Sequence, residues 1–176
     1  MRIGPGTVIE ANASVHEGSS IGAGVHVRSG AVLGSEGFQS LQHAGGILQM
    51  AHGGGVSLQD HVEIFANAVV AKAVFRQVTS VGRHSRIGNC AFVSHNVQVG
   101  ERCFVGHNAT INGNTSVGDD VWIGPNATVS NLLCLGARSR ISLGGVVMQS
   151  VPEDTHVTGM PAIEHRRMLR HAVSVR

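Results

Sequence analysis

An aliphatic side chain recurs at every sixth position from residue 81 to residue 147. These positions are Val81, Ile87, Val93, Val99, Val105, Ile111, Val117, Ile123, Val129, Leu135, Ile141 and Val147. The side chain two residues before many of them is small, which gives each hexad two candidate inward positions. A period of six matches neither an α-helix nor a simple alternating strand. It is typical of a solenoid in which each hexad forms one short strand and one corner.

Three hexads form one coil of 18 residues, which predicts a parallel β-helix with a triangular cross-section. Residues one coil apart, such as Val93, Ile111 and Val129, are expected to stack at the inter-strand spacing of about 4.8 Å. Glycine follows many of the aliphatic residues, and Gly and Asn suit the corners because both tolerate positive φ. The same spacing from Ile3 to Leu33 adds two further coils.

Two interruptions break the repeat. The segment between Leu33 and Leu58 is too long for a corner and too rich in Gly and His for a strand, which predicts an inserted loop at about residues 35–55. Long loops in compact domains are often functional, and the apolar residues of this one favour packing against a neighbouring surface. Between Val70 and Val81 the spacing slips, and we expect a bulge that keeps the intervening Phe75 in register.

Two prolines mark the end of the repeat. Pro152 and Pro161 predict a β-helix domain over residues 1–151 and a tail over residues 152–176. The sequence from Pro161 onward predicts a short helix with this proline in its first turn. We expect its basic residues to face solvent, with binding of a cofactor phosphate by Arg166 as the alternative.

Composition and charge narrow the classes of partner. The 176 residues include 13 Lys and Arg and 11 Asp and Glu, for a net charge of +2, and 3% of the residues are aromatic. The chain has neither the basic block nor the aromatic platform that would indicate a nucleic-acid partner. No apolar run approaches the ~18 residues of a membrane-spanning helix, and the first residues lack the apolar centre of a signal peptide. We therefore expect a soluble, cytoplasmic protein that does not insert into membranes.

The outer faces of such a prism indicate self-association. Phe92, Phe104 and Trp122 fall at outward positions of their hexads, where they would leave apolar surface exposed. A closed homotrimer is the symmetric way to cover that surface.

Several motifs carry a resemblance to a known family. They are GSEGF at residues 34–38, HGGGVSLQDHVEI at 52–64, and the stretch at 81–108 with VSHNVQ at its centre. Together they resemble the hexapeptide-repeat acyltransferases, and within them the UDP-3-O-acyl-glucosamine N-acyltransferases of lipid A synthesis and related N-acyltransferases of nucleotide-linked amino sugars. The resemblance implies an all-β, left-handed parallel β-helix, a homotrimer, and active sites in the grooves between prisms.

The resemblance also assigns roles to individual residues. It makes His95 the catalytic base, places Asn96 beside it, and assigns Gly113, one coil further on, to the oxyanion hole. Formation of an amide from a thioester requires removal of the amine proton, a task that suits a neutral imidazole. A corner without a side chain lets the thioester approach a backbone N–H. Gly113, Asn131 and Arg166 are the expected contacts of the acyl donor.

The expected substrates follow from the same resemblance. The donor would be acyl-CoA or an acyl-carrier protein, with no permanently bound cofactor, and the acceptor a small-molecule amino sugar. The ending VPEDTHVTGMPA resembles the coenzyme-A-dependent members of the family, and the later histidine expected of a lipid A N-acyltransferase is missing near Leu132. N-acylation of another amino sugar is therefore the broader expectation.

Two other classes of function remain open. The γ-class carbonic anhydrases share this prism and bind zinc through three histidines, but His84, His95 and His107 are spaced by eleven and twelve residues and would fall on different corners. No metal ligand is therefore predicted. A non-catalytic scaffold of hexapeptide repeats is the third possibility.

Overall fold

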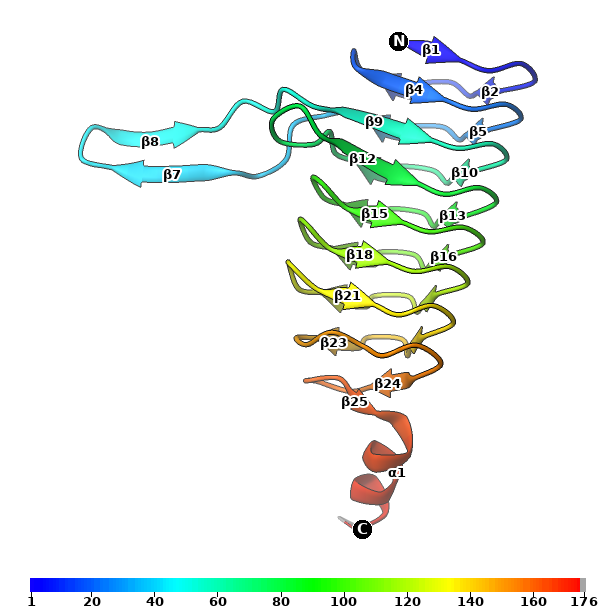
Figure 1. Cartoon of the computed structure of the whole chain (residues 1–176), viewed down its shortest axis with the longest axis vertical. Coiled ribbons are helices and arrows are strands. Elements are labelled where there is room, and N and C mark those ends of the chain that lie inside the picture. Colours follow the sequence, from blue (N-terminus) through cyan, green and yellow to red (C-terminus); the bar gives the residue numbers. More distant parts are fainter. Residues whose placement is uncertain (175–176) are drawn as a thin grey trace.

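The protein folds as a parallel β-helix whose three sheets form the faces of a prism (Figure 1). The computed structural model describes residues 1–174. Sheet A contains β1 (Arg2–Ile3), β4 (Ser19–Ile21), β9 (Gly55–Leu58), β12 (Val78–Val81), β15 (Gln98–Val99), β18 (Ser116–Val117) and β21 (Cys134–Leu135). Sheet B contains β2 (Val8–Ile9), β5 (His26–Val27), β10 (Glu63–Ile64), β13 (Arg86–Ile87), β16 (Phe104–Val105), β19 (Trp122–Ile123), β22 (Arg140–Ile141), β24 (His156–Thr158) and β25 (Ile163–Glu164). Sheet C contains β3 (Ser14–Val15), β6 (Val32–Leu33), β11 (Val69–Val70), β14 (Phe92–Val93), β17 (Thr110–Ile111), β20 (Thr128–Val129) and β23 (Val146–Val147).

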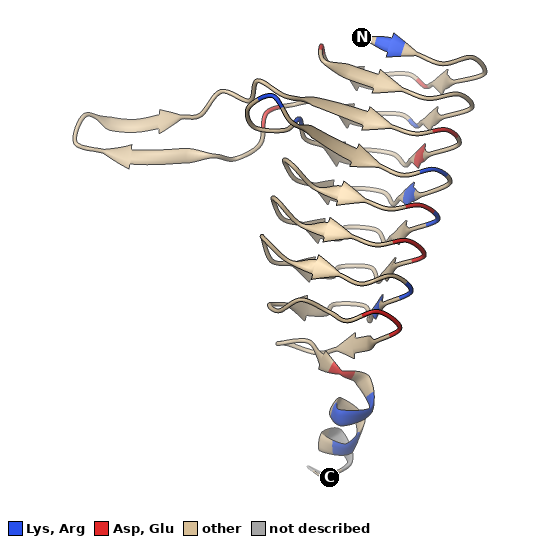
Figure 2. Cartoon of the chain, viewed as in Figure 1, with Lys and Arg blue, Asp and Glu red and all other residues tan. Residues whose placement is uncertain are grey.

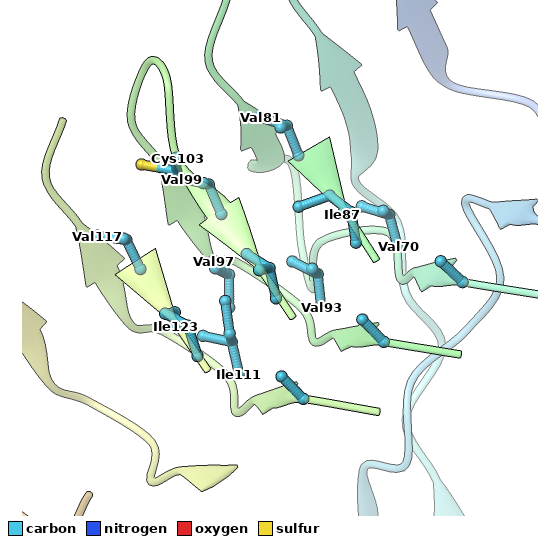
Figure 3. Close-up of a cluster of buried hydrophobic side chains, with 14 of the residues drawn as sticks. Val70, Val81, Ile87, Val93, Val97, Val99, Cys103, Ile111, Val117 and Ile123 are labelled. Carbon is cyan, nitrogen blue, oxygen red and sulfur yellow. The ribbon is translucent and has the colours of Figure 1, made fainter. Parts of the chain in front are cut away.

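The predicted stacking is confirmed by the strand register. Val93 pairs with Ile111 and Ile111 pairs with Val129, each in parallel strands of sheet C. All twelve aliphatic residues of the repeat are at most 4% exposed, and the small side chains two positions earlier are also buried. The core is a narrow column of aliphatic side chains along the prism axis (Figure 3).

The corners repeat as regularly as the strands do. The third residue after each core aliphatic has φ between 54° and 61° from His84 to Arg138, and Asn occupies this position most often. The glycine that directly follows the aliphatic has a different role from the one expected. A Cβ on Gly100 would lie 2.6 Å from the carbonyl oxygen of Gly118 in the next coil. These glycines therefore permit close approach between coils, and positive φ is supplied by the later position.

Both interruptions leave the prism at the corner where the chain passes from sheet C to sheet A, called here the C–A corner. The first forms an antiparallel hairpin, β7 (Ser40–His43) and β8 (Gly46–Gln49), which projects away from the prism (Figure 1). The second is a loop at residues 71–77. The expected register for Phe75 is wrong, because this residue is 67% exposed in the 71–77 loop, and the inward pattern resumes only in β12 with Thr79 and Val81.

The C-terminal end also differs in detail from the expectation. Parallel pairing continues past residue 151, because β24 adds to sheet B next to β22. Helix α1 (His165–Ser174) begins after Pro161, since the intervening β25 pairs with β24. The Glu164 side chain accepts hydrogen bonds from the backbone N–H groups of Arg166 and Arg167 and so caps the helix. Residues 175–176 of the expected tail lie outside the described residues.

Charged and aromatic side chains occupy separate outer surfaces. Acidic and basic residues alternate along the corner between sheets A and B (Figure 2), where Arg102 binds Asp120 and Arg138 binds Asp154. The three outward aromatic residues lie on two faces, Phe92 on sheet C and Phe104 and Trp122 on sheet B. They do not form a single apolar flank. Within residues 1–174, no helix is long and apolar enough to cross a membrane.

The stacked column predicts which substitutions destabilise the prism. Ile111→Ala removes a fully buried side chain and leaves a cavity between two coils that cannot close independently. We expect a loss of about 2–5 kcal/mol in the free energy of unfolding, measured by chemical denaturation. Ser116→Ala on the exposed side of sheet A is the control and should change stability by less than about 0.5 kcal/mol. Equal effects of the two substitutions would contradict the inward assignment.

Candidate functional site

The C–A corner gathers the chain's irregular segments and the predicted base. The hairpin leaves between β6 and β9, the 71–77 loop leaves one coil later, and His95 occupies the same corner in the coil after that. Backbone bonds join these layers, since Lys72 N–H donates to the Ser35 carbonyl. One edge of the prism therefore carries both interruptions of the repeat and His95.

His95 faces a small cavity directly above the next coil. The cavity measures about 250 Å³ and is lined by Phe38, Gln39, Ser94, His95, Asn112, Gly113, Asn114 and Asn131. A Cβ at Gly113 would lie 2.5 Å from Nε2 of His95, so any larger residue would displace the ring. Nδ1 of His95 is buried without a hydrogen-bond partner among the described residues. Nε2 is therefore the ring nitrogen available to a substrate.

The backbone of Gly113 complements this arrangement. Its carbonyl accepts a hydrogen bond from the N–H of Leu132 in the next coil. Its own N–H donates to no group within the described part of the chain. A free N–H beside an imidazole is the kind of donor that can stabilise a developing oxyanion.

A second histidine lies against His95. His52, at the end of the insertion, is 3% exposed, and its ring centroid is 5.7 Å from that of His95 in an edge-to-face arrangement. Nδ1 of His52 lies 3.1 Å from the carbonyl oxygen of Met50, while Nε2 is buried and has no partner among the described residues. A Cβ on Gly37 would contact both rings, at 3.1 Å from His52 Nε2 and 3.6 Å from His95 Cδ2.

The surroundings of His95 favour its neutral form. Burial lowers the pKa of His95 below the ordinary histidine value, and the nearby His52 acts in the same direction. The Asn96 side chain raises this pKa, by less than burial lowers it but by more than His52 does. At neutral pH the imidazole is consequently available as a proton acceptor.

Asn96 is held by the 71–77 loop. Its Oδ1 accepts a hydrogen bond from Val74 N–H at 2.8 Å, and its Nδ2 donates to the Gln77 side chain. Its backbone N–H donates to Thr79 Oγ1 at 2.9 Å. With φ of 61°, Asn96 forms the corner itself and fixes the loop beside His95.

The predicted donor contacts separate into two regions. Asn131 lines the same cavity as His95 and Gly113. Arg166 instead lines a cavity of about 610 Å³ between β24 and α1, together with Asp154, Thr155, His156, Glu164, His165 and Arg170. Within one chain, the structure does not bring Arg166 to the His95 cavity.

The histidines considered for metal binding lie at three different corners. His84 lies at the corner between sheets A and B, where its ring stacks on that of His61 with the ring centroids 5.0 Å apart. His107 lies at the corner between sheets B and C, and its Nδ1 accepts a hydrogen bond from the backbone N–H of Asn89. Within residues 1–174, no three His, Cys, Asp or Glu side chains converge as metal ligands would.

Three residues around His95 were not predicted from the sequence. His52 and Gly37 belong to the insertion, and Phe38 lines the cavity although its side chain is 94% exposed. The sequence did contain a signal for the position of the insertion, because Leu33 and Val93 are core residues of the same column of sheet C. The insertion after Leu33 therefore had to leave from the corner that carries His95.

Comparison with known proteins gives matches to transferases of the hexapeptide class. A family model described as "Bacterial transferase hexapeptide (six repeats)" matches residues 1–35 and 78–113. UDP-3-O-acylglucosamine N-acyltransferase from Caulobacter sp. is 36% identical over 150 residues, which cover 85% of this chain and 44% of that relative. The chain thus spans less than half the length of this relative.

Solved structures give the same result for the fold. UDP-N-acetylglucosamine acyltransferase from Bacteroides fragilis superposes with a TM-score of 0.82 at 22% identity, covering 97% of this chain and 66% of that one. A mutant perosamine N-acetyltransferase from Caulobacter crescentus, in complex with CoA and GDP-perosamine, has a TM-score of 0.56 at 22% identity and covers 90% and 55% of the two chains. These likenesses confirm the predicted left-handed parallel β-helix, and the sequence matches confirm the predicted resemblance to the hexapeptide-repeat acyltransferases.

Proposed function

We propose that the protein transfers an acyl group from a thioester to the amine of a nucleotide-linked amino sugar. The observation that carries the proposal is the His95 ring in contact with Gly113, with Nε2 as its accessible nitrogen. A proton acceptor beside an unused backbone N–H would supply the two groups that aminolysis of a thioester requires, which supports the proposal.

The first step forms the amide bond. The amine nitrogen attacks the thioester carbonyl while Nε2 of His95 takes the amine proton. The carbonyl electrons move to oxygen, and the N–H of Gly113 stabilises the resulting oxyanion. The burial that lowers the pKa of His95 keeps the ring neutral before the reaction, so that it can accept this proton.

The second step releases the products. The oxyanion collapses to a carbonyl, the carbon–sulfur bond breaks, and the thiolate takes the proton from the His95 imidazolium. The imidazole thus returns to its neutral form without any other reactant. No metal ion or permanently bound cofactor is needed for this sequence.

The substrate classes follow from the relatives. The Caulobacter sp. relative is named for acylation of a UDP-linked glucosamine, and the Caulobacter crescentus structure contains CoA and GDP-perosamine. We propose a CoA or acyl-carrier-protein thioester as donor, with Asn131 as a contact near the reacting carbonyl. Arg166 and Arg170, which line the C-terminal cavity, are proposed to bind phosphate groups of the donor when prisms associate.

A trimer would bring these parts together. Groove-facing residues from two prisms would then line each site, and the outward Phe92, Val69 and Val32 of sheet C would be covered. We expect light scattering to give a mass three times that of the chain at micromolar concentration. A monomer under these conditions would contradict sites formed between prisms.

The proposed base predicts a large effect on turnover. His95→Ala should lower kcat about 10²–10⁴-fold, or about 3–5 kcal/mol of barrier, with little change in thermal stability. Steady-state kinetics should use acetyl-CoA or a longer acyl-CoA with a panel of nucleotide-linked amino sugars. Because the pKa of His95 is lowered, kcat/KM of the native protein should be level above neutral pH and fall only below the ordinary histidine pKa of about 6.5.

His107→Ala provides the control for that measurement. His107 lies at the corner between sheets B and C, so its removal should leave kcat within about threefold of the native value. Loss of turnover in His107→Ala but not in His95→Ala would show that His95 is not the base. If neither variant loses activity, the acyltransferase proposal fails.

The projecting hairpin predicts a separate effect on substrate binding. Leu41, Ile47 and Leu48 are more than half exposed, and an isolated two-stranded hairpin is marginally stable without a packing surface. Replacing residues 40–49 with a short Gly-Ser link, which retains Glu36 and His52, should preserve the oligomer and lower kcat/KM at least about tenfold if the hairpin covers a groove. Unchanged kinetics would show that the hairpin does not contribute to substrate binding.

A further inference from the structure

Two histidines from different coils meet at the proposed site, and only one of them has a role so far. His95 belongs to the repeat, whereas His52 lies at the return of the insertion into β9. The side chain of His52 is almost fully buried at 3% exposure. Buried polar groups are normally paired, so an unpaired ring nitrogen at this place requires an explanation.

The hydrogen bonds of His52 determine its protonation pattern. The Met50 carbonyl, 3.1 Å from Nδ1, can only accept a hydrogen bond, so in the neutral ring Nδ1 carries the proton. Nε2 is then an acceptor, and it has no partner among the described residues. A buried acceptor without a partner is unfavourable, and a donor at this position would remove that penalty.

The position of Nε2 identifies that donor. Gly37 lies between the two rings, and a Cβ at this residue would be 3.1 Å from His52 Nε2 and 3.6 Å from His95 Cδ2. The missing side chain leaves room between the His52 acceptor and the edge of the His95 ring that carries Nε2. The ring centroids are 5.7 Å apart, a separation that one hydrogen bond or one bridging water could span.

We propose that His52 is a positioning residue whose Nε2 accepts a hydrogen bond from the His95 imidazolium formed during acyl transfer. The inference rests on the proposed function for its role in turnover, although the contact between the rings does not depend on it. In the tautomer that can accept the amine proton, neutral His95 has a lone pair on Nε2 and cannot donate there. Once His95 has taken the amine proton, Nε2 becomes a donor, so His52 stabilises the charged state selectively.

The charged groups around His52 are few. Its backbone N–H donates to Glu36 Oε1 at 3.4 Å, and the same oxygen lies 3.7 Å from Lys72 Nζ. Glu17 and Lys72, together with His52, line a separate cavity of about 200 Å³. The Glu36–Lys72 ion pair connects the base of the hairpin to the 71–77 loop. Because Glu36 also accepts a hydrogen bond from the His52 backbone, the position of the hairpin base influences that of His52.

Two substitutions separate the acceptor from the packing role. His52→Asn places an amide near the position of Nδ1, which keeps a donor for the Met50 carbonyl but removes the acceptor at Nε2. His52→Gln reaches further and can place an amide oxygen near the position of Nε2. Neither side chain titrates, so a comparison of the two variants excludes repulsion between two charged imidazoles.

The test that needs no substrate is an NMR titration of the His95 ring in the full chain. The pKa of His95 should be higher in His52→Gln than in His52→Asn by about 0.4–1 pH unit, the equivalent of one net hydrogen bond. Equal values in the two variants would overturn the proposal. Gly37→Ala, which fills the gap while retaining both histidines, should lower the pKa of His95 relative to the native chain, and it decides the question if a His52 variant does not fold.

Kinetics then test the role in turnover. With acetyl-CoA and the amino-sugar acceptor that the native chain uses, His52→Asn should lower kcat about tenfold or more with KM within about twofold, and His52→Gln should recover most of the loss. His84→Asn is the matched control, since His84 also lies beside a second histidine but at another corner, and it should leave kcat unchanged. An active His52→Asn variant would overturn the role of His52, whereas absence of acyl transfer by the native chain would overturn the proposed function and leave the NMR comparison to decide the contact.

Discussion

The stacking of identical coils is the constraint on which the rest of the molecule depends. Each strand of two to four residues pairs with the strand one coil away, so every coil must return to the same register. A residue added inside a strand would rotate all later side chains by one position and expose the core. Extra residues can therefore leave only at a corner, where the chain has already stopped pairing.

Corners also allow polar chemistry that the strands exclude. From Val81 to Val147 the aliphatic side chain at every sixth position is at most 4% exposed, and the outward strand positions carry side chains that lie outside this core. At the C–A corner, by contrast, His95 lies partly buried between the hairpin base and Gly113 of the next coil. The burial that lowers its pKa thus comes from the insertion and the neighbouring coil together.

The repeat could be predicted from the sequence because its physical cause is local and periodic. The contact of His95 with Gly113 was also predictable, since residues 18 positions apart stack in a regular coil. Where the count departs from six, the expectation was wrong: Phe75 was expected to stay in register, yet it is exposed, and the repeat resumes with the buried Thr79, which accepts a hydrogen bond from Asn96 N–H. The glycines after the core residues were likewise assigned to positive φ, although Gly100 meets a close approach of the next coil.

The pairing of His52 with His95 required the structure because an insertion has no period from which its return path can be calculated. The column shared by Leu33 and Val93 limits the insertion to the C–A corner, but 18 residues separate Leu33 from His52 and many paths fit that length. The path is fixed by contacts between segments: Lys72 with Ser35 and Glu36, Val74 with Asn96. Since His52 lies within this set of contacts, a change in the seating of the hairpin moves the acceptor beside His95. The insertion and the proposed base therefore form one structural unit, although His95 belongs to the six-residue repeat and the insertion has no such period.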